Sequence, residues 1–316
     1  MAVLKKSTLI FVIVTVLLLT TIFSNYILDG YYHTGSLRGG HKEIDDWNSD
    51  SELCFIIRIA EKDISRLFTL FFSILHVNQE ENVRIMVIQA YNPSEVKQKR
   101  ISLLQHIVKT TNIVINREAV TILDIDGSYT SKMYPELKNA SRAGDAGYVI
   151  TDLTIENIIA HRKEVGNSYC PLIAVSNGDN MYSHNFIPAT ITAINNGYDI
   201  VATHFVSRYN WFKDPIQHQH SGPFRHGKDT EIRTKFYPGF IDLGCVVFKI
   251  NLLETSGYRF VIDSIRKNIN KLRDIDFPRE YYGLDFNLAD GILFRKLAHM
   301  KDVDSKVINR ALYIHQ

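Results

Sequence analysis

The residues best suited to chemistry lie where a run of apolar residues ends. Residues 172–182 read LIAVSNGDNMY, a strand-like run followed at once by oxygen-bearing side chains. In a parallel α/β sheet, ligands bind beyond the carboxyl ends of the strands. Asp179 is suited to hold a hard divalent cation that neutralises a diphosphate, and Asn177 can hydrogen-bond a ribose or sugar hydroxyl. The sequence Asn-Gly-Asp-Asn also favours a tight turn, so a purely structural turn stays open.

Alternating strand-like and helix-like runs would position this segment. Residues 53–59 (LCFIIRI) and 83–89 (VRIMVIQ) are nearly continuous apolar runs, typical of strands covered on both faces. Between them, apolar residues at three-to-four spacing indicate a helix that Asp63 opens. The alternation predicts an α/β fold with a mainly parallel central sheet and helices on both faces. The expected strands are 53–59, 83–89, 120–125, 171–176 and 199–205, and the expected helices are 63–77, 94–110, 151–164 and 187–195.

The predicted strand ends lack the glycine patterns of several common α/β enzymes. No G-x-G-x-x-G, G-x-x-x-x-G-K-[ST] or G-x-S-x-G sequence follows a strand. This argues against a dinucleotide dehydrogenase, a P-loop enzyme and an α/β-hydrolase. Lys and Arg number 36 against 34 Asp and Glu, a balance that favours no nucleic-acid partner. No second boundary is visible, so residues 52–316 are interpreted as one domain.

The order of the motifs resembles that of glycosyltransferases with the GT-A fold. Their signature is an Asp-x-Asp motif at the end of a central strand, and Asn177-Gly178-Asp179 matches it with Asn in the first position. The resemblance implies a GT-A-like, nucleotide-sugar-binding, Rossmann-like domain. It also implies an Mn²⁺ or Mg²⁺ ion held by Asp179, and transfer of a sugar from a nucleotide-sugar donor to a hydroxyl of a glycan, glycoprotein or glycolipid.

Two segments resemble the donor side of that family. Arg58, in the sequence Ile-Arg-Ile-Ala, ends the first predicted strand, where family members cradle the nucleotide. Thr151 and Asp152 follow Tyr-Val-Ile and resemble the helix whose Asp contacts the base or ribose. The pair Thr-Asp is also typical of a helix N-cap, which stays open as the alternative.

Two further segments resemble the acceptor side. In 240–248 (FIDLGCVVF), the resemblance implies that Asp242 binds a sugar hydroxyl and that Gly244 admits substrate close to the backbone, with a bulge or turn as the alternative. In 281–295, Asp285 or Asp290 corresponds to an acidic residue that would deprotonate the acceptor if the reaction inverts configuration. Asp290 precedes a helical run, so an N-cap role is the alternative.

Histidines offer two further hypotheses. His315, near the end of the chain, corresponds to the second metal ligand of several GT-A families, with an ordinary surface histidine as the alternative. His218, His220 and His226 would suit a zinc-dependent hydrolase, but no carboxylate or cysteine completes a ligand set nearby, and an acceptor loop with Tyr209 and Trp211 is favoured. Asn177 also admits a non-catalytic lumenal binding protein that kept the fold.

The N-terminal sequence predicts a membrane anchor. Lys5 and Lys6 precede an uncharged, apolar stretch at 7–28, which is long enough to span a bilayer and lacks a small-x-small cleavage site. We therefore expect a cytosolic tail at 1–6, a signal anchor at 7–28 and a stalk at 29–51. The domain would lie in the lumen of the Golgi or ER as a single-pass type II membrane protein.

The three cysteines, Cys54, Cys170 and Cys245, all lie in or beside apolar runs. Because an odd number cannot pair completely, three free core thiols are favoured, with one disulfide as the alternative.

Overall fold

The computed structural model describes residues 52–75, 82–90, 97–123, 147–207, 230–262 and 288–315. The predicted tail, anchor and stalk, the loop with His218, His220 and His226, and Asp285 lie outside these ranges. None of the helices in the described ranges is long and apolar enough to cross a membrane.

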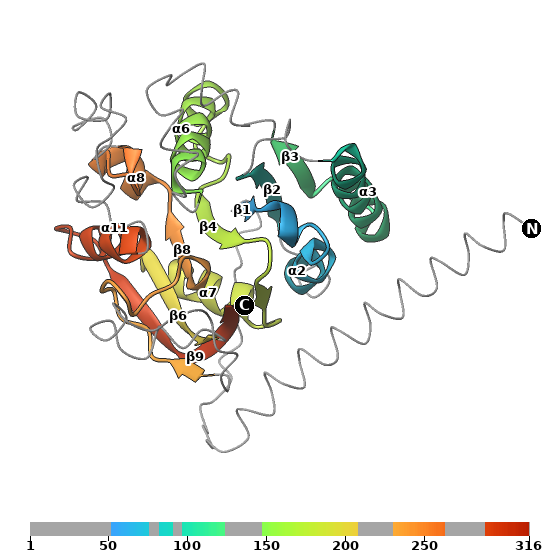
Figure 1. Ribbon diagram of the computed structural model, residues 1–316. Coiled ribbons are helices and arrows are strands. Elements are labelled where there is room, and N and C mark those ends of the chain that lie inside the picture. Colours follow the sequence, from blue (N-terminus) through green and yellow to red (C-terminus); the bar gives the residue numbers. More distant parts are fainter. Residues whose placement is uncertain are drawn as a thin grey trace, which may run out of the picture.

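A nine-stranded mixed sheet forms the centre of the domain, in the order β3-β2-β1-β4-β8-β6-β9-β5 with β7 beside β6 (Figure 1). β1 pairs in parallel with β2 and β4, β2 with β3, and β6 with β9, whereas β5, β7 and β8 pair antiparallel. The strands are β1 (Leu53–Ile59), β2 (Val83–Gln89), β3 (Val120–Leu123), β4 (Leu172–Asn177), β5 (Met181–Tyr182), β6 (Ile200–Ser207), β7 (Thr230–Ile232), β8 (Val246–Lys249) and β9 (Ser305–His315).

Helices cover both faces of this sheet. On one face, Phe186 of the helix after β5 contacts Phe55 of β1, and on the other the guanidinium of Arg58 lies over Tyr148 of the helix before β4. Figure 1 shows α2 and α6 on opposite sides of β1 and β4. The helices are α2 (Leu67–Leu75), α3 (Gln98–Ile115), α6 (Tyr148–Val165), α7 (Phe186–Asn195), α8 (Asn251–Ser256) and α11 (Ala289–Ala298), with 3₁₀ turns η1 (Glu61–Asp63) and η6 (Leu243–Cys245).

The predicted α/β fold with a mainly parallel sheet is confirmed. Every residue of β1 is buried, as its nearly continuous apolar sequence predicts, and this includes Arg58. Several boundaries differ from the prediction, and α3 runs from Gln98 to Ile115 where a helix was expected at 94–110. α2 begins at Leu67, after a 3₁₀ turn at residues 61–63, and α6 begins at Tyr148. In the segment 240–248, residues 243–245 form a 3₁₀ turn and β8 begins at Val246.

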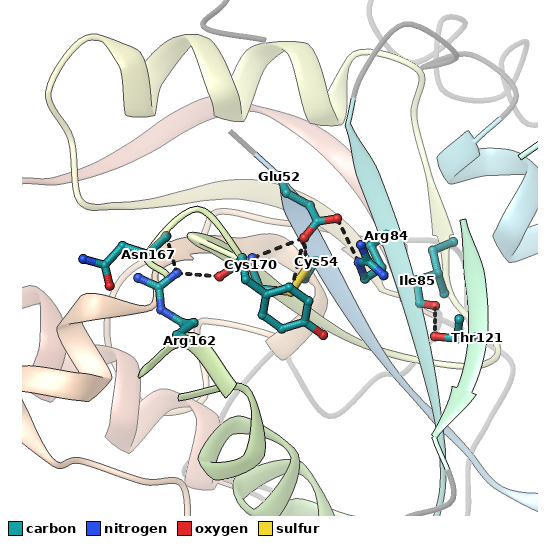
Figure 2. The surroundings of a disulfide bond; sticks show 9 residues. Glu52, Cys54, Arg84, Ile85, Thr121, Arg162, Asn167 and Cys170 are labelled. Atoms are coloured by element: carbon teal, nitrogen blue, oxygen red, sulfur yellow. Dashed lines mark hydrogen bonds and ion pairs between the residues drawn. A yellow bond between two sulfur atoms is a disulfide. The ribbon is translucent and has the colours of Figure 1, made fainter. Parts of the chain in front are cut away.

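The prediction of three free thiols is wrong, because Cys54 and Cys170 form a disulfide with a Cα–Cα distance of 5.3 Å (Figure 2). They meet because β1 and β4 are neighbours, with Cys54 opposite Ile173 in the register. Cys245 is free and buried. The disulfide therefore joins the amino-terminal ends of the two strands whose carboxyl ends carry Arg58 and Asn177.

Glu52 connects the disulfide to the neighbouring strand. One carboxylate oxygen accepts from Nε of Arg84 on β2 at 2.8 Å, and the other accepts from the backbone N–H of Cys170 at 3.2 Å (Figure 2). The ends of β1, β2 and β4 are thus held together at this pole of the sheet.

We predict that breaking the disulfide lowers the free energy of unfolding by about 2–5 kcal/mol, because it closes a long loop in the unfolded chain; the two cysteines are 116 residues apart. Chemical denaturation with and without a thiol reductant measures the loss. A Cys54→Ser/Cys170→Ser variant should match the reduced protein and ignore the reductant, and Cys245→Ser should keep the full reductant effect. An unchanged midpoint in reduced wild-type protein would contradict the prediction.

Candidate functional site

The centre of the candidate site is the pair Arg58 and Asn177, which lie opposite each other in the parallel register of β1 and β4. Nε and Nη2 of Arg58 both donate to Oδ1 of Asn177, at 3.0 and 2.7 Å. The guanidinium carbon lies 4.6 Å from the centre of the Tyr148 ring, a cation–π distance. The arginine is therefore fixed on two sides at the carboxyl ends of the central strands.

The Asn177-Gly178-Asp179 segment is a tight turn, as its sequence allows. The N–H of Gly178 donates to the carbonyl oxygen of Arg58 at 2.8 Å. A Cβ at position 178 would lie 2.8 Å from Ile59 and 3.1 Å from Asp63, so only glycine fits against β1 and η1. The turn places the next side chain, Asp179, at the sheet edge that the motif predicts. The segment is therefore a turn, and this turn is compatible with a binding role for Asp179.

Asp179 is a buried carboxylate with charged neighbours. Burial raises its pKa above the usual range and Asp63 raises it further, while His315 and Lys62 lower it. Nη1 of Arg66 lies 3.8 Å away, but that side chain is 57% exposed, so the ion pair contributes little. A divalent cation would offset the burial of this charge.

His315 comes to the same place from the end of the chain. β5 pairs antiparallel with β9, with Met181 opposite Ile314, so the end of β9 runs beside the turn that carries Asp179. His315 is only 7% exposed, which excludes the surface-histidine alternative. Its Nε2 lies 3.7 Å from Oδ2 of Asp242, so the carboxylate is a charged neighbour of the ring without a hydrogen bond to it.

Asp242 and Gly244 flank this histidine. Asp242 caps η6, and its Oδ1 accepts from the N–H of Gly244 at 2.9 Å. A Cβ at position 244 would overlap the ring of Tyr313. The expected reason for Gly244 therefore needs correction, since its missing side chain makes room for an aromatic ring of β9 rather than for a substrate.

Asp290 lies in the first turn of α11, and its predicted N-cap alternative is wrong because Leu288 occupies that position. Its Oδ1 accepts from the N–H of Gly291 at 2.7 Å. The pKa of Asp290 is raised to about 7, first by burial and then by the charge of Asp242, while the Gly291 amide and Arg58 act to lower it. A carboxyl group that titrates near neutrality is suited to act as a base.

Thr151 and Asp152 are turned into the protein interior, and both side chains are 0% exposed. The N-cap alternative is wrong because α6 begins at Tyr148, with Gly147 at its N-cap. The Thr151 hydroxyl donates to the carbonyl of Gly147 at 2.8 Å. The Asp152 carboxylate accepts from three consecutive backbone amides, those of Phe260, Val261 and Ile262, at 2.9, 2.8 and 3.0 Å. These contacts do not support the predicted role of the pair in nucleotide binding.

Asp179 and His315 fit a divalent cation by their chemistry, because a carboxylate oxygen and an imidazole nitrogen suit Mn²⁺ or Mg²⁺. Two protein ligands leave coordination positions for phosphate oxygens and water. Among the described residues, one group places three metal-ligating atoms within 4.8 Å of one another, and it is Glu52, Cys54 and Cys170. The disulfide uses both sulfurs of that group.

Two residues of the site escaped the sequence reasoning. Tyr148 supplies the ring under Arg58, and Asn180 is 1% exposed, with its Nδ2 donating to the hydroxyl of Ser176 at 3.2 Å. The position of Asn180 directly after the motif was the available signal. Nothing in the sequence relates Tyr148 to Arg58, because the contact depends on how α6 packs on β1.

Comparison with known proteins found similar solved structures only. No protein-family model and no curated protein matches the sequence. S. aureus TarS 1–349 matches with a TM-score of 0.41 and 9% identity, over 83% of this chain and 60% of that one. Mannosyltransferase PcManGT from Pyrobaculum calidifontis, in complex with GDP-Man and Mn²⁺, matches with a TM-score of 0.45 and 8% identity, over 96% and 67%. Galactosyltransferase LgtC, in complex with donor and acceptor sugar analogs, matches with a TM-score of 0.39 and 8% identity, over 77% and 70%.

Two of these structures are thus glycosyltransferases, the class whose motifs the sequence resembles. The chain spans 60% of the length of the first structure named. At 8–9% identity and TM-scores of 0.39–0.45, these likenesses do not assign a reaction or a substrate to this chain.

We predict that Asp152→Ala lowers the free energy of unfolding by about 2–5 kcal/mol, because three buried amides lose their acceptor. Asp152→Asn should cost less, since one oxygen remains. Chemical denaturation of both variants measures the difference. A variant that unfolds like the wild type but binds nucleotide poorly would contradict this prediction and show that Asp152 contributes to nucleotide binding.

Proposed function

We propose that the protein is a metal-dependent glycosyltransferase that uses a nucleotide-sugar donor. The observation that carries the proposal is that the turn with Asp179 lies beside the end of β9, close enough for His315 to lower the pKa of Asp179, and next to the Arg58–Asn177 pair. All four lie at the carboxyl ends of strands or directly after one, where α/β sheets bind ligands. Buried carboxylate, imidazole and guanidinium groups at one edge suit a diphosphate with its cation.

In this proposal, different residues contribute in different ways to stabilising the departing diphosphate. Asp179 and His315 would hold Mn²⁺ or Mg²⁺, which supplies positive charge to the diphosphate as it departs. Asp242 places a carboxylate 3.7 Å from the His315 ring, which favours the charge of a nearby cation. Asn177 fixes Arg58, whose cation faces the same edge. A rigid, preformed arrangement stabilises developing charge without the cost of reorganisation.

Asp290 is the proposed general base if the reaction inverts configuration. It is buried and titrates near neutrality, so its carboxylate can accept the proton of an acceptor hydroxyl during attack on the anomeric carbon. Asp285, the other candidate, lies outside the described ranges. If the reaction retains configuration, Asp290 binds the acceptor instead.

The proposal places the domain in the lumen of the Golgi or ER, anchored by residues 7–28, with a glycan, glycoprotein or glycolipid acceptor. The apolar N-terminal sequence and the Cys54–Cys170 disulfide support this, because disulfides persist in oxidising compartments. Protease protection of the domain in intact microsomes tests it, and digestion from the cytosolic side would contradict it.

Titration of a nucleoside diphosphate by calorimetry, with and without Mn²⁺, tests the metal site. We expect Mn²⁺ to strengthen binding to the wild type, and Asp179→Ala to abolish that gain because no carboxylate remains for the cation. His315→Ala should act in the same direction but less completely, since phosphate or water can replace a neutral ligand. Asp199→Ala, remote from the site at the start of β6, serves as control. An unaffected Asp179→Ala variant would show that the motif is only a turn.

The pH dependence of transfer tests Asp290. Because its pKa is raised to about 7, the ionised fraction grows as the pH rises through 7 and is lost as the pH falls below it. We therefore expect kcat to fall with pH below about 7 in the wild type. Asp290→Asn should lower kcat roughly 100-fold or more and remove this limb of the profile. An active Asp290→Asn variant with the wild-type pH profile of kcat would show that Asp290 is not the general base.

A further inference from the structure

Arg58 is a buried cation that forms no ion pair with any of the described residues. The residue is 5% exposed, and no carboxylate lies within ion-pair distance of it among the described residues. Its Nη1 is buried and has no hydrogen-bond partner there. A buried, unpaired charge costs several kcal/mol, so folded proteins normally give it an anion or a full set of acceptors.

The other buried arginine of the described ranges shows the usual solution. Arg162 is also 5% exposed, but its Nε donates to a carboxylate oxygen of Glu254 at 2.7 Å. Its Nη1 donates to the backbone carbonyls of Asn167 and Tyr169. Arg162 is thus a structural arginine, whose donors bind protein groups. Arg58 differs because its Nη1 binds none of the described residues.

Asn177 is what leaves the charge of Arg58 uncompensated. Its Oδ1 accepts both hydrogen bonds, but the amide is neutral. An aspartate at this position of the register would form an ion pair with the guanidinium instead. The ring of Tyr148 holds the opposite face of the guanidinium without a formal charge. Among the described residues, the direct contacts that position the arginine are therefore with neutral groups.

The acidic residues of the site are engaged elsewhere. Asp242 accepts from the Gly244 amide and lies 3.7 Å from His315. Asp179 lies near Arg66, Lys62 and His315. Asp290 accepts from the Gly291 amide and lies near enough to Arg58 for the guanidinium to lower its pKa, but no ion pair joins the two side chains. None of them is a fixed partner for the free Nη1 of Arg58.

We propose that Arg58 is an anion-binding residue whose free Nη1 binds a phosphate-type group, and that Asn177 stands in the motif because an aspartate would close this site. The identity of the anion as the donor diphosphate rests on the proposed function; the binding of the anion itself needs no metal. Arg58 is then a second, permanent cation beside the Asp179–His315 cation site. The departure from Asp-x-Asp becomes a functional feature rather than a sign of lost activity.

Calorimetry with inorganic pyrophosphate in excess EDTA tests this without metal, donor or turnover. We expect the wild type to bind, and Arg58→Met and Asn177→Asp each to weaken binding by about tenfold or more, the first by removing the charge and the second by neutralising it. Asn177→Ser, which adds no charge, should keep most of the affinity. Arg66→Met, the exposed arginine of the site, is the matched control and should change the affinity far less.

Thermal unfolding separates this role from a structural one. Because Arg58 forms no ion pair among the described residues, Arg58→Met should unfold at or above the wild-type temperature, whereas Arg162→Met should unfold lower by leaving Glu254 unpaired. Wild-type protein that ignores pyrophosphate in EDTA, or an Arg58→Met or Asn177→Asp variant that binds it normally, would overturn the inference. If these results hold but Mn²⁺ adds nothing to nucleoside diphosphate binding, the anion site stands and the proposed metal-dependent function fails.

Discussion

The parallel pairing of β1 with β4 is the interaction on which the rest of the structure depends. Its register runs from Leu53 opposite Leu172 to Arg58 opposite Asn177. At one end the Cys54–Cys170 disulfide and Glu52 hold the strands together, and at the other the side chains of the site meet. A slip of one residue would turn Arg58 away from the α6 face and separate it from Asn177.

Burial governs the electrostatics of the site. Asp179, Asp242, Asp290, Arg58 and His315 are each at most 8% exposed, so their charges are poorly screened by water. Burial raises the pKa of both Asp179 and Asp290, and a cation near the first would favour its ionised form. In the proposed function, a divalent cation and a diphosphate would offset these buried charges, which is the physical basis of the proposal.

The sequence predicted what depends on short-range patterns. β1 and β2 have their expected bounds because continuous apolar runs mark strands buried on both faces, and the end of β4 was found because polar residues follow it directly. Contacts between segments that are distant in the chain could not be predicted from the sequence. The disulfide depends on β1 and β4 being neighbours, and the need for Gly244 depends on where Tyr313 packs. The structural contacts of Asp152 could not be seen in the sequence, because its three amide partners lie more than a hundred residues later.

The central claim is that this edge of the sheet binds a nucleotide sugar through a cation held by Asp179. Thermal unfolding in the presence of a panel of nucleotide sugars tests it most directly, because a ligand that binds only the folded state raises the unfolding temperature. The account predicts that at least one nucleotide sugar stabilises the wild type in Mn²⁺, less so in EDTA, and fails to stabilise Asp179→Ala. Stabilisation by none of them, or equal stabilisation of the variant, would contradict it.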